Sequence, residues 1–147
     1  MMILLGSLLL SLGTLQDERE FLGLRIIDEN AKSGFQAGME KFISSEKDWV
    51  AIWTERQANL KTKLPHPRID FDKHVIVVVA LGRKNTAGYS VEITRVIKTK
   101  DDIQIFLKKT APRDGSHPAA VVTSPFVFAR MEKPDLPVVF RDEEKKR

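Results

Sequence analysis

A continuous apolar run in the middle of the sequence constrains the fold more than any other feature. Residues 75–81 read V-I-V-V-V-A-L and contain five β-branched side chains. A run of this length without alternating polar residues is typical of a strand that is covered on both faces. We therefore expect a central strand here.

Other segments predict further strands. Residues 89–97 alternate, with Tyr89, Val91 and Ile93 on one side, and residues 103–107 alternate again after a turn at 100–102. The short connections favour an antiparallel meander of 75–81, 89–97 and 103–107. Further strands are expected in residues 35–43, in 119–131 with an interruption at Pro125, and in 136–140. The prolines indicate strand edges or strand starts.

One helix is expected after Ser45, an N-cap residue with Asp48 three positions later as in a capping box. Trp49, Trp53 and Leu60 fall on one stripe at helical spacing, together with residue 52. A ligand-stacking role for the tryptophans is open, but this spacing favours packing against a core. The fold class we expect is mainly β, a β-sandwich or partly open barrel of antiparallel strands with one packed α-helix.

The first fifteen residues carry no charged side chain, and residues 3–12 form an apolar run of about ten residues, the length of a signal-peptide core. Ser11 and Gly13 offer the small residues that a signal peptidase reads. We expect a signal peptide at 1–13, with a buried element of the domain as the alternative. Export to the periplasm, cell envelope or extracellular space follows, without a membrane span after signal removal. The chain has no cysteine, so a lipoprotein is excluded.

The remaining boundaries follow from composition. Residues 14–33 are charge-rich and predict a linker or a marginal edge strand, residues 34–140 the folded domain, and residues 141–147 a charged tail. The length of 147 residues fits one domain.

Most catalytic classes lack a supporting pattern. Without cysteine there is no thiolate metal site, disulfide or cysteine nucleophile, and His66, His74 and His117 have no short ligand spacing. No nucleophile elbow or phosphate-binding glycine loop occurs, so we expect no catalytic residue, metal or cofactor. The net charge of +4 is a small difference between 24 basic and 20 acidic residues, which does not indicate nucleic-acid binding. A hydrolase or metal enzyme remains an alternative that requires a polar pocket with His74 or His117 near carboxylates.

The segment 82–89, G-R-K-N-T-A-G-Y, joins two apolar strands and contains the only tyrosine. It has two interpretations. In one it is a structural turn, where Gly82 and Gly88 adopt positive φ. In the other, the small residues Thr86, Ala87 and Gly88 let the backbone approach another protein closely. Composition leaves both open.

Four segments together resemble a known family. These are Trp49–Trp53, residues 69–73 leading into 75–82, T-A-G-Y-S-V-E-I at 86–93, and T-S-P-F at 123–126. In order and spacing they resemble the C-terminal domain of the PrcB family of protease-complex subunits, over about residues 33–140. Ala87 stands where a second glycine is usual in that family, and Phe126 where an aromatic with a hydroxyl is common.

The resemblance implies a non-catalytic exported protein that binds and supports or stabilises a partner protease, with 123–126 beside the contact loop. The binding residues it indicates are Asn85, Thr86, Ala87, Gly88, Tyr89, Thr123, Ser124, Pro125 and Phe126. The loop is also similar, more distantly, to the N-P-T-T-G-Y loop of chagasin-type protease inhibitors, although it lacks the proline. Inhibition through the same loop is therefore the alternative. The identity of the partner and the oligomeric state stay open.

Overall fold

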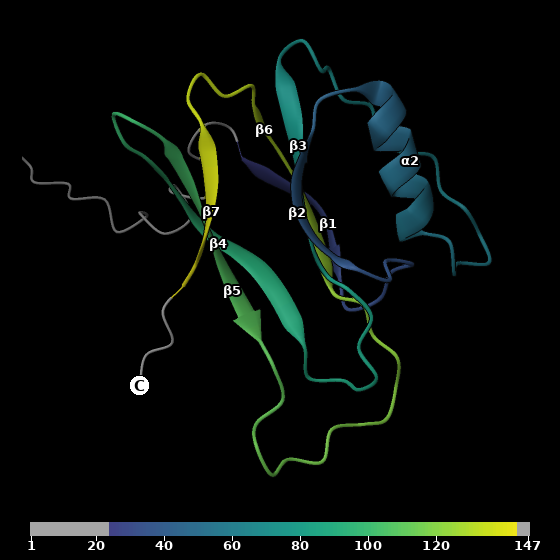
Figure 1. Ribbon diagram of the computed structural model, residues 1–147. Coiled ribbons are helices and arrows are strands. Elements are labelled where there is room, and N and C mark those ends of the chain that lie inside the picture. Colours follow the sequence, from purple (N-terminus) through teal and green to yellow (C-terminus); the bar gives the residue numbers. More distant parts are fainter. Residues whose placement is uncertain (1–23, 144–147) are drawn as a thin grey trace, which may run out of the picture.

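The computed structural model describes residues 24–143. The expected signal peptide at 1–13, residues 14–23 of the expected linker and residues 144–147 of the expected tail lie outside the described residues. In chain order the elements are β1 (Arg25–Asn30), β2 (Gly38–Ile43), α2 (Glu46–Arg56), β3 (His74–Leu81), β4 (Ser90–Lys98), β5 (Ile103–Thr110), β6 (Phe126–Glu132) and β7 (Val138–Asp142) (Figure 1).

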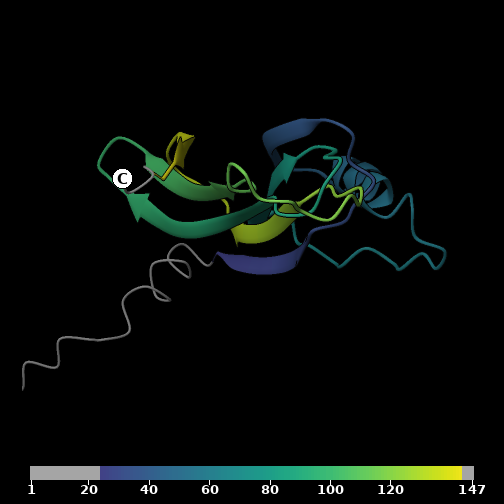
Figure 2. The same ribbon diagram turned by 90° about the horizontal axis from the view of Figure 1, so that it is seen from below.

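The strands form two sheets. A four-stranded antiparallel sheet has the order β1-β6-β3-β2, and a three-stranded sheet has the order β4-β5-β7. Helix α2 covers the outer face of the four-stranded sheet, and the three-stranded sheet packs on its other face (Figures 1 and 2). The expected β-sandwich with one packed helix is confirmed, and the sheets of the described residues do not close into a barrel. One pairing departs from the antiparallel expectation, because β5 and β7 run parallel.

Strand β3 is central and covered on both faces, as its sequence predicts. Val75, Val77 and Val79 belong to the core between the two sheets, whereas Ile76 and Val78 belong to the core beneath α2. All five side chains are buried. The unbroken apolar run is therefore required by two packing layers, and alternation would have left one of them polar.

Helix α2 begins where the sequence predicts. The Ser45 side chain accepts a hydrogen bond from the Asp48 amide at 3.2 Å. Trp49 and Trp53 are buried, and their indole N–H groups donate to backbone carbonyls at 2.9 Å each, so the packing interpretation is confirmed. The expectation for Leu60 was wrong: the helix ends at Arg56, so Leu60 leaves the helical stripe and is exposed.

The expected three-stranded meander is also wrong. Strand β3 pairs with β2 and β6, whereas β4 pairs with β5. The antiparallel β4–β5 pair matches the expectation, but residues 82–89 cross from one sheet to the other and do not close a hairpin. The physical reason is burial: β3 needs cover on two faces, whereas β4 alternates and needs cover on one.

The proline-containing segment also differs in part. Residues 119–125 form no strand apart from one isolated bridge at Thr123, and β6 starts directly after Pro125. The strand start is thus confirmed, but β6 lies inside its sheet, between β1 and β3. Proline has no backbone N–H, and at this position only its carbonyl has to form a hydrogen bond. The Pro125 carbonyl accepts that bond from the Leu81 amide at 2.9 Å.

Both ends of the expected domain extend further than the composition indicates. Residues 25–30, within the expected linker or edge strand, form the edge strand β1 against β6. At the other end, β7 continues to Asp142, into the expected charged tail. No helix among the described residues has the length and apolar character needed to cross a membrane.

Lys109 joins the two sheets through ion pairs. It is on β5, and its ammonium lies 2.7 Å from the Glu40 carboxylate on β2 and 3.1 Å from the Asp142 carboxylate on β7. The hydrogen bond to Glu40 is the main cause of a raised pKa of Lys109. Because the pair is partly exposed, solvent weakens its contribution to stability.

Candidate functional site

The 82–89 loop lies at one end of the sandwich beside the connection from β5 to β6, residues 111–125. Figure 1 shows both at the lower end of the molecule, and Figure 2 looks onto that end. We call these two segments together the loop end. The structure thus brings together the two segments that the sequence singles out.

Backbone hydrogen bonds fasten the 82–89 loop to the 111–125 connection. Lys84 and Thr123 exchange a pair of bonds at 2.8 and 2.9 Å, and the Ala87 amide donates to the Ala119 carbonyl at 3.0 Å. The Thr123 hydroxyl donates to the Thr86 carbonyl at 2.9 Å. The loop is therefore held at three positions along its length, which lowers the entropy it would lose on binding.

Two glycines of the loop are required by its backbone. Gly82 and Gly88 have φ values of +80° and +96°, as the turn interpretation predicts. A Cβ atom at Gly88 would come within 2.9 Å of the Pro112 side chain. The sharp path of the loop and its close approach to the 111–125 connection both depend on Gly88.

The side chains of the loop remain accessible between these fixed points. Asn85 and Gly88 are exposed, and Thr86, Ala87 and Tyr89 are partly exposed. The Lys84 ammonium lies 5.2 Å from the centre of the Tyr89 ring, within cation–π distance. The loop therefore presents a narrow, small-residue surface on a fixed backbone, which suits both the structural and the binding interpretation.

Residues 123–126 are buried, although the resemblance implied that they contact the partner. Thr123 is 5% exposed, Ser124 3% and Phe126 1%, and Pro125 is buried as well. Only a small part of these side chains is therefore available to a partner while the domain stays folded. Their burial follows from their place at the start of the interior strand β6, where the chain enters the core.

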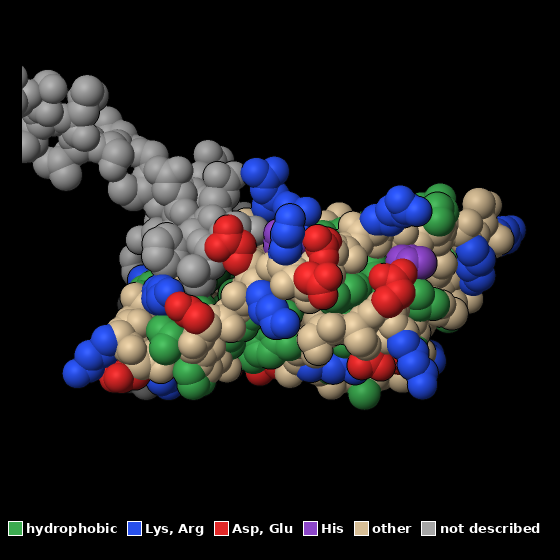
Figure 3. Space-filling model, turned by 90° about the horizontal axis from the view of Figure 1, so that it is seen from above, with side chains coloured by type: hydrophobic (Ala, Val, Ile, Leu, Met, Phe, Trp, Pro, Cys, Tyr) green, Lys and Arg blue, Asp and Glu red, His purple; other side chains and the backbone are tan. Residues whose placement is uncertain are grey.

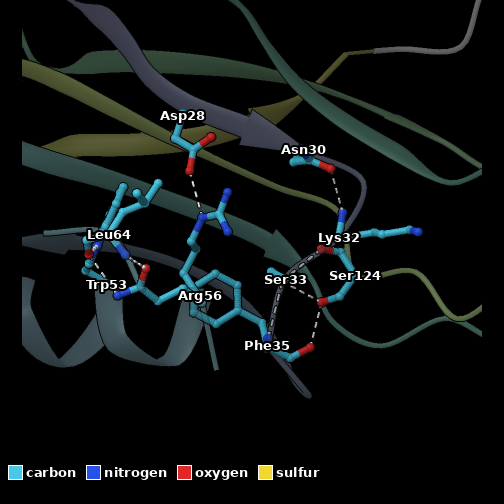
Figure 4. A network of polar contacts seen from close by, with 10 residues as sticks. Asp28, Asn30, Lys32, Ser33, Phe35, Trp53, Arg56, Leu64 and Ser124 are labelled. Atoms are coloured by element: carbon cyan, nitrogen blue, oxygen red, sulfur yellow. Dashed lines mark hydrogen bonds and ion pairs between the residues drawn. The ribbon is translucent and has the colours of Figure 1, made fainter. Parts of the chain in front are cut away.

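Ser124 connects the loop end to the segment before β2. Its hydroxyl donates to the Phe35 carbonyl at 2.6 Å and accepts from the Ser33 hydroxyl at 2.9 Å, and its amide donates to the Ala31 carbonyl at 2.8 Å. Figure 4 shows Ser33, Ser124 and Phe35 joined in this network. Every polar group of Ser124 is therefore used to position the chain.

The buried position of Phe126 in the core beneath α2 suits an aromatic side chain without a hydroxyl group. Its ring packs against Phe35 and Phe128, with centroid distances of 5.9 and 5.0 Å. The Arg56 guanidinium carbon lies over the ring, 4.9 Å from its centre. A hydroxyl at this position would have to find a partner inside the helix-side core.

One surface feature escaped the sequence analysis. Val121 and Val122 are exposed on the 111–125 connection, although their apolar character places them in an expected strand. The only signal in the sequence is that this apolar pair stands between turn-forming residues and does not alternate with polar ones. They lie directly before Thr123, so they belong to the loop end.

The enzyme alternative finds no matching arrangement in the described residues. His66 pairs with Glu46 at 2.7 Å, His74 starts β3, and His117 is exposed in the 111–125 connection. No group of three potential metal ligands forms within residues 24–143. Two surface pockets at the loop end, of about 220 and 250 Å³, contain no histidine in their linings.

The opposite end of the molecule differs in character from the loop end. Figure 3 views this opposite end and shows acidic and basic side chains interspersed over it. Asp135 on this side binds the Lys98 ammonium at 3.1 Å, which lowers the pKa of its carboxyl. Interspersed charges of this kind are typical of a solvated surface.

Comparison with known proteins gives one family match. Residues 75–132 match the family described as PrcB C-terminal. The matched range runs from β3 to the end of β6 and so contains the 82–89 loop and the whole 111–125 connection. No curated protein and no solved structure matches the chain.

Proposed function

We propose, from the match of residues 75–132 to the PrcB C-terminal family, that the protein is a non-catalytic accessory subunit of a protease. The family supports a protease-associated role. We propose further that Asn85–Tyr89 is the contact loop and that the protein supports or stabilises its partner.

The observation that carries this proposal is the combination of exposure and rigidity in the 82–89 loop. Its backbone is fastened by Thr123 and Ala119, while Asn85 and Gly88 face solvent. A loop that is already fixed in its bound form loses little conformational entropy when a partner docks. Loops held by a rigid sheet are the usual place for such contacts.

The proposed role requires no chemistry from this chain. A subunit that covers part of another protein stabilises it by binding the folded state and not the unfolded state. We also propose that the protein is exported, on the basis of the apolar run at residues 3–12, so that it meets its protease in the envelope or outside the cell.

Affinity capture tests the proposal. The full chain with a C-terminal tag is produced in its own cells, recovered from envelope and secreted fractions, and analysed by mass spectrometry. We expect a protease to be retained and the N-terminus of the recovered chain to start near Thr14. Asn85→Lys should lose the protease, because it places a long cation on the exposed loop.

Ser44→Lys is the matched control, since Ser44 is exposed near the start of α2 and the change adds the same charge. Equal protease recovery with both variants would remove the loop from the proposal, and absence of any protease would remove the subunit role. Once the protease is purified, its activity and thermal survival are measured with added parent protein. Prolonged survival supports the accessory role, whereas dose-dependent loss of activity would replace it with inhibition.

A further inference from the structure

A groove of about 250 Å³ lies on the helix side of the loop end, next to the 82–89 loop. We call it the helix-side groove. Leu60 and Val122 are the large apolar residues of its lining, Lys32 and Arg56 are the charged residues, and Ser33, Asn59, Thr123 and Ser124 complete it. It combines segments from three distant parts of the sequence.

The apolar part of the groove is open to solvent. Leu60 is 41% exposed and Val122 is 53% exposed, so both belong to the few large apolar side chains of the described residues that lie outside the two cores. They come from two different segments, the connection after α2 and the connection before β6. An apolar side chain of another molecule placed between them would remove both from water.

The charged part of the groove is cationic. Lys32 and Arg56 are the charged residues of the lining, and no carboxylate contributes to it. Arg56 is paired with Asp28, which is not part of the lining and whose carboxylate accepts from Arg56 Nε at 2.7 Å. Within the described residues this is the only hydrogen bond of the Arg56 side chain, so four of its five N–H donors have no protein acceptor there.

The cation is also fixed in place. The Arg56 side chain is 12% exposed, its guanidinium carbon lies 4.9 Å from the Phe126 ring centre, and Asp28 holds its Nε. Figure 4 shows Arg56 held beside Asp28, with the Ser33–Ser124–Phe35 network on its other side. A guanidinium held in this way binds a carboxylate without first ordering a flexible side chain.

We propose that the helix-side groove binds an extended acidic segment of the partner protein. An apolar side chain of that segment lies between Leu60 and Val122, and a neighbouring carboxylate faces Lys32 and Arg56. This inference rests on the proposed function for the identity of the partner. It extends the contact surface across Thr123, which lines the groove and whose hydroxyl bonds the Thr86 carbonyl.

Three matched peptides test the proposal with the purified ¹⁵N-labelled protein. The probe is acetyl-Gly-Glu-Leu-Glu-Gly-amide, the charge control replaces both glutamates with lysine, and the apolar control replaces leucine with serine. We expect the probe to shift the amide resonances of Lys32, Leu60 and Val122, and each control to bind about tenfold more weakly or less. Shifts of equal size with the lysine peptide, or none with the probe, would overturn the proposal.

Two substitutions in the groove lining test whether the probe peptide binds there. Val122→Asp and Lys32→Glu should each weaken probe binding about tenfold, because they remove the apolar border or reverse the rim charge. Their matched controls are Leu64→Asp, at an exposed leucine outside the groove lining, and Lys47→Glu, at an exposed lysine on α2. Probe binding that survives Val122→Asp and Lys32→Glu contradicts the assignment.

Different results would overturn the protease-subunit proposal and the proposal for the helix-side groove. Asn85→Lys should leave probe binding unchanged, because Asn85 does not line the groove. Protease capture that depends on Asn85, without any probe binding, would overturn the groove alone. Specific probe binding without protease capture would support the groove chemistry and overturn the subunit role.

Discussion

Residues 85–89 and residues 123–126 lie side by side in the structure and both fall in the range that matches the PrcB C-terminal family, yet the first segment is exposed or partly exposed and the second is buried. Thr123 joins them through the Thr86 carbonyl. The difference shows that a pattern of adjacent residues can contain a solvent-exposed part, the proposed contact loop, and a buried anchoring part. The anchoring part fixes the position from which the contact part is presented.

The difference has a local cause. The 82–89 loop crosses between two sheets and belongs to no strand, whereas residues 123–126 lead into β6, which lies between two other strands. Changes in the buried segment should therefore cost stability. Changes in the exposed loop should cost binding alone, except where a glycine is required.

The largest expected effect is at Phe126. Phe126→Ala removes a ring that packs against Phe35, Phe128 and Arg56, and it should lower the free energy of unfolding by about 3–5 kcal/mol. Urea denaturation followed by tryptophan fluorescence measures it. A loss below about 1 kcal/mol would show that this segment is not an anchor.

Ser124 comes next. Ser124→Ala leaves the buried Phe35 carbonyl without its hydrogen-bond donor, and it should cost about 1–3 kcal/mol, whereas the Ser33 hydroxyl keeps its bond to the backbone carbonyl of residue 124. Ser116→Ala is the control, because the Ser116 hydroxyl bonds the Arg113 carbonyl on an exposed part of the same connection. We expect the control to stay within about 0.5 kcal/mol of the parent. Equal losses would remove the distinction between the two positions.

A substitution at Gly88 tests the backbone requirement of the loop separately from its proposed contact role. Gly88→Ala forces an alanine to φ +96° and against Pro112, and it should cost about 1–2 kcal/mol. Gly115→Ala is the comparison, since Gly115 has φ +77° but nothing within 4 Å of an added Cβ. Thermal denaturation should show a larger loss for Gly88 than for Gly115. The reverse order would contradict the close approach to Pro112.

The smallest effect is at Lys109, away from both segments. Lys109→Met should cost less than about 1 kcal/mol, because the ion pairs with Glu40 and Asp142 are partly exposed. The pKa of Lys109 is raised above 10.5, so its contribution is complete below pH 10.5 and disappears as the pH rises through the folded-state pKa. The difference in stability between parent and variant should therefore shrink above pH 10.5. A difference that stays constant to higher pH would contradict this.

The sequence predicts the faces of the elements better than their partners. The double coverage of β3 follows from its unbroken apolar run, and the start of α2 follows from Ser45 and the spacing of Trp49 and Trp53. The parallel β5–β7 pair and the crossing at 82–89 do not follow, because alternation specifies which face is buried and not which strand lies beside it.

The candidate site shows the same limit. The exposed loop with positive φ at Gly82 and Gly88 is predictable from its glycines and small residues. The burial of 123–126 is not, because T-S-P-F has the composition of a turn and is buried through bonds to Ala31 and Phe35, about ninety residues earlier. The exposed Val121 and Val122 reverse the ordinary expectation for apolar residues.

The most direct test is the affinity of the captured protease for parent, Asn85→Lys and Phe126→Leu, measured by biolayer interferometry at a temperature where all three are folded. Asn85→Lys should raise Kd about tenfold or more with an unchanged melting temperature, because it blocks the exposed contact. Phe126→Leu should lower the melting temperature and leave Kd close to that of the parent. Unchanged affinity in Asn85→Lys together with lost affinity in folded Phe126→Leu would contradict the division into contact and anchor.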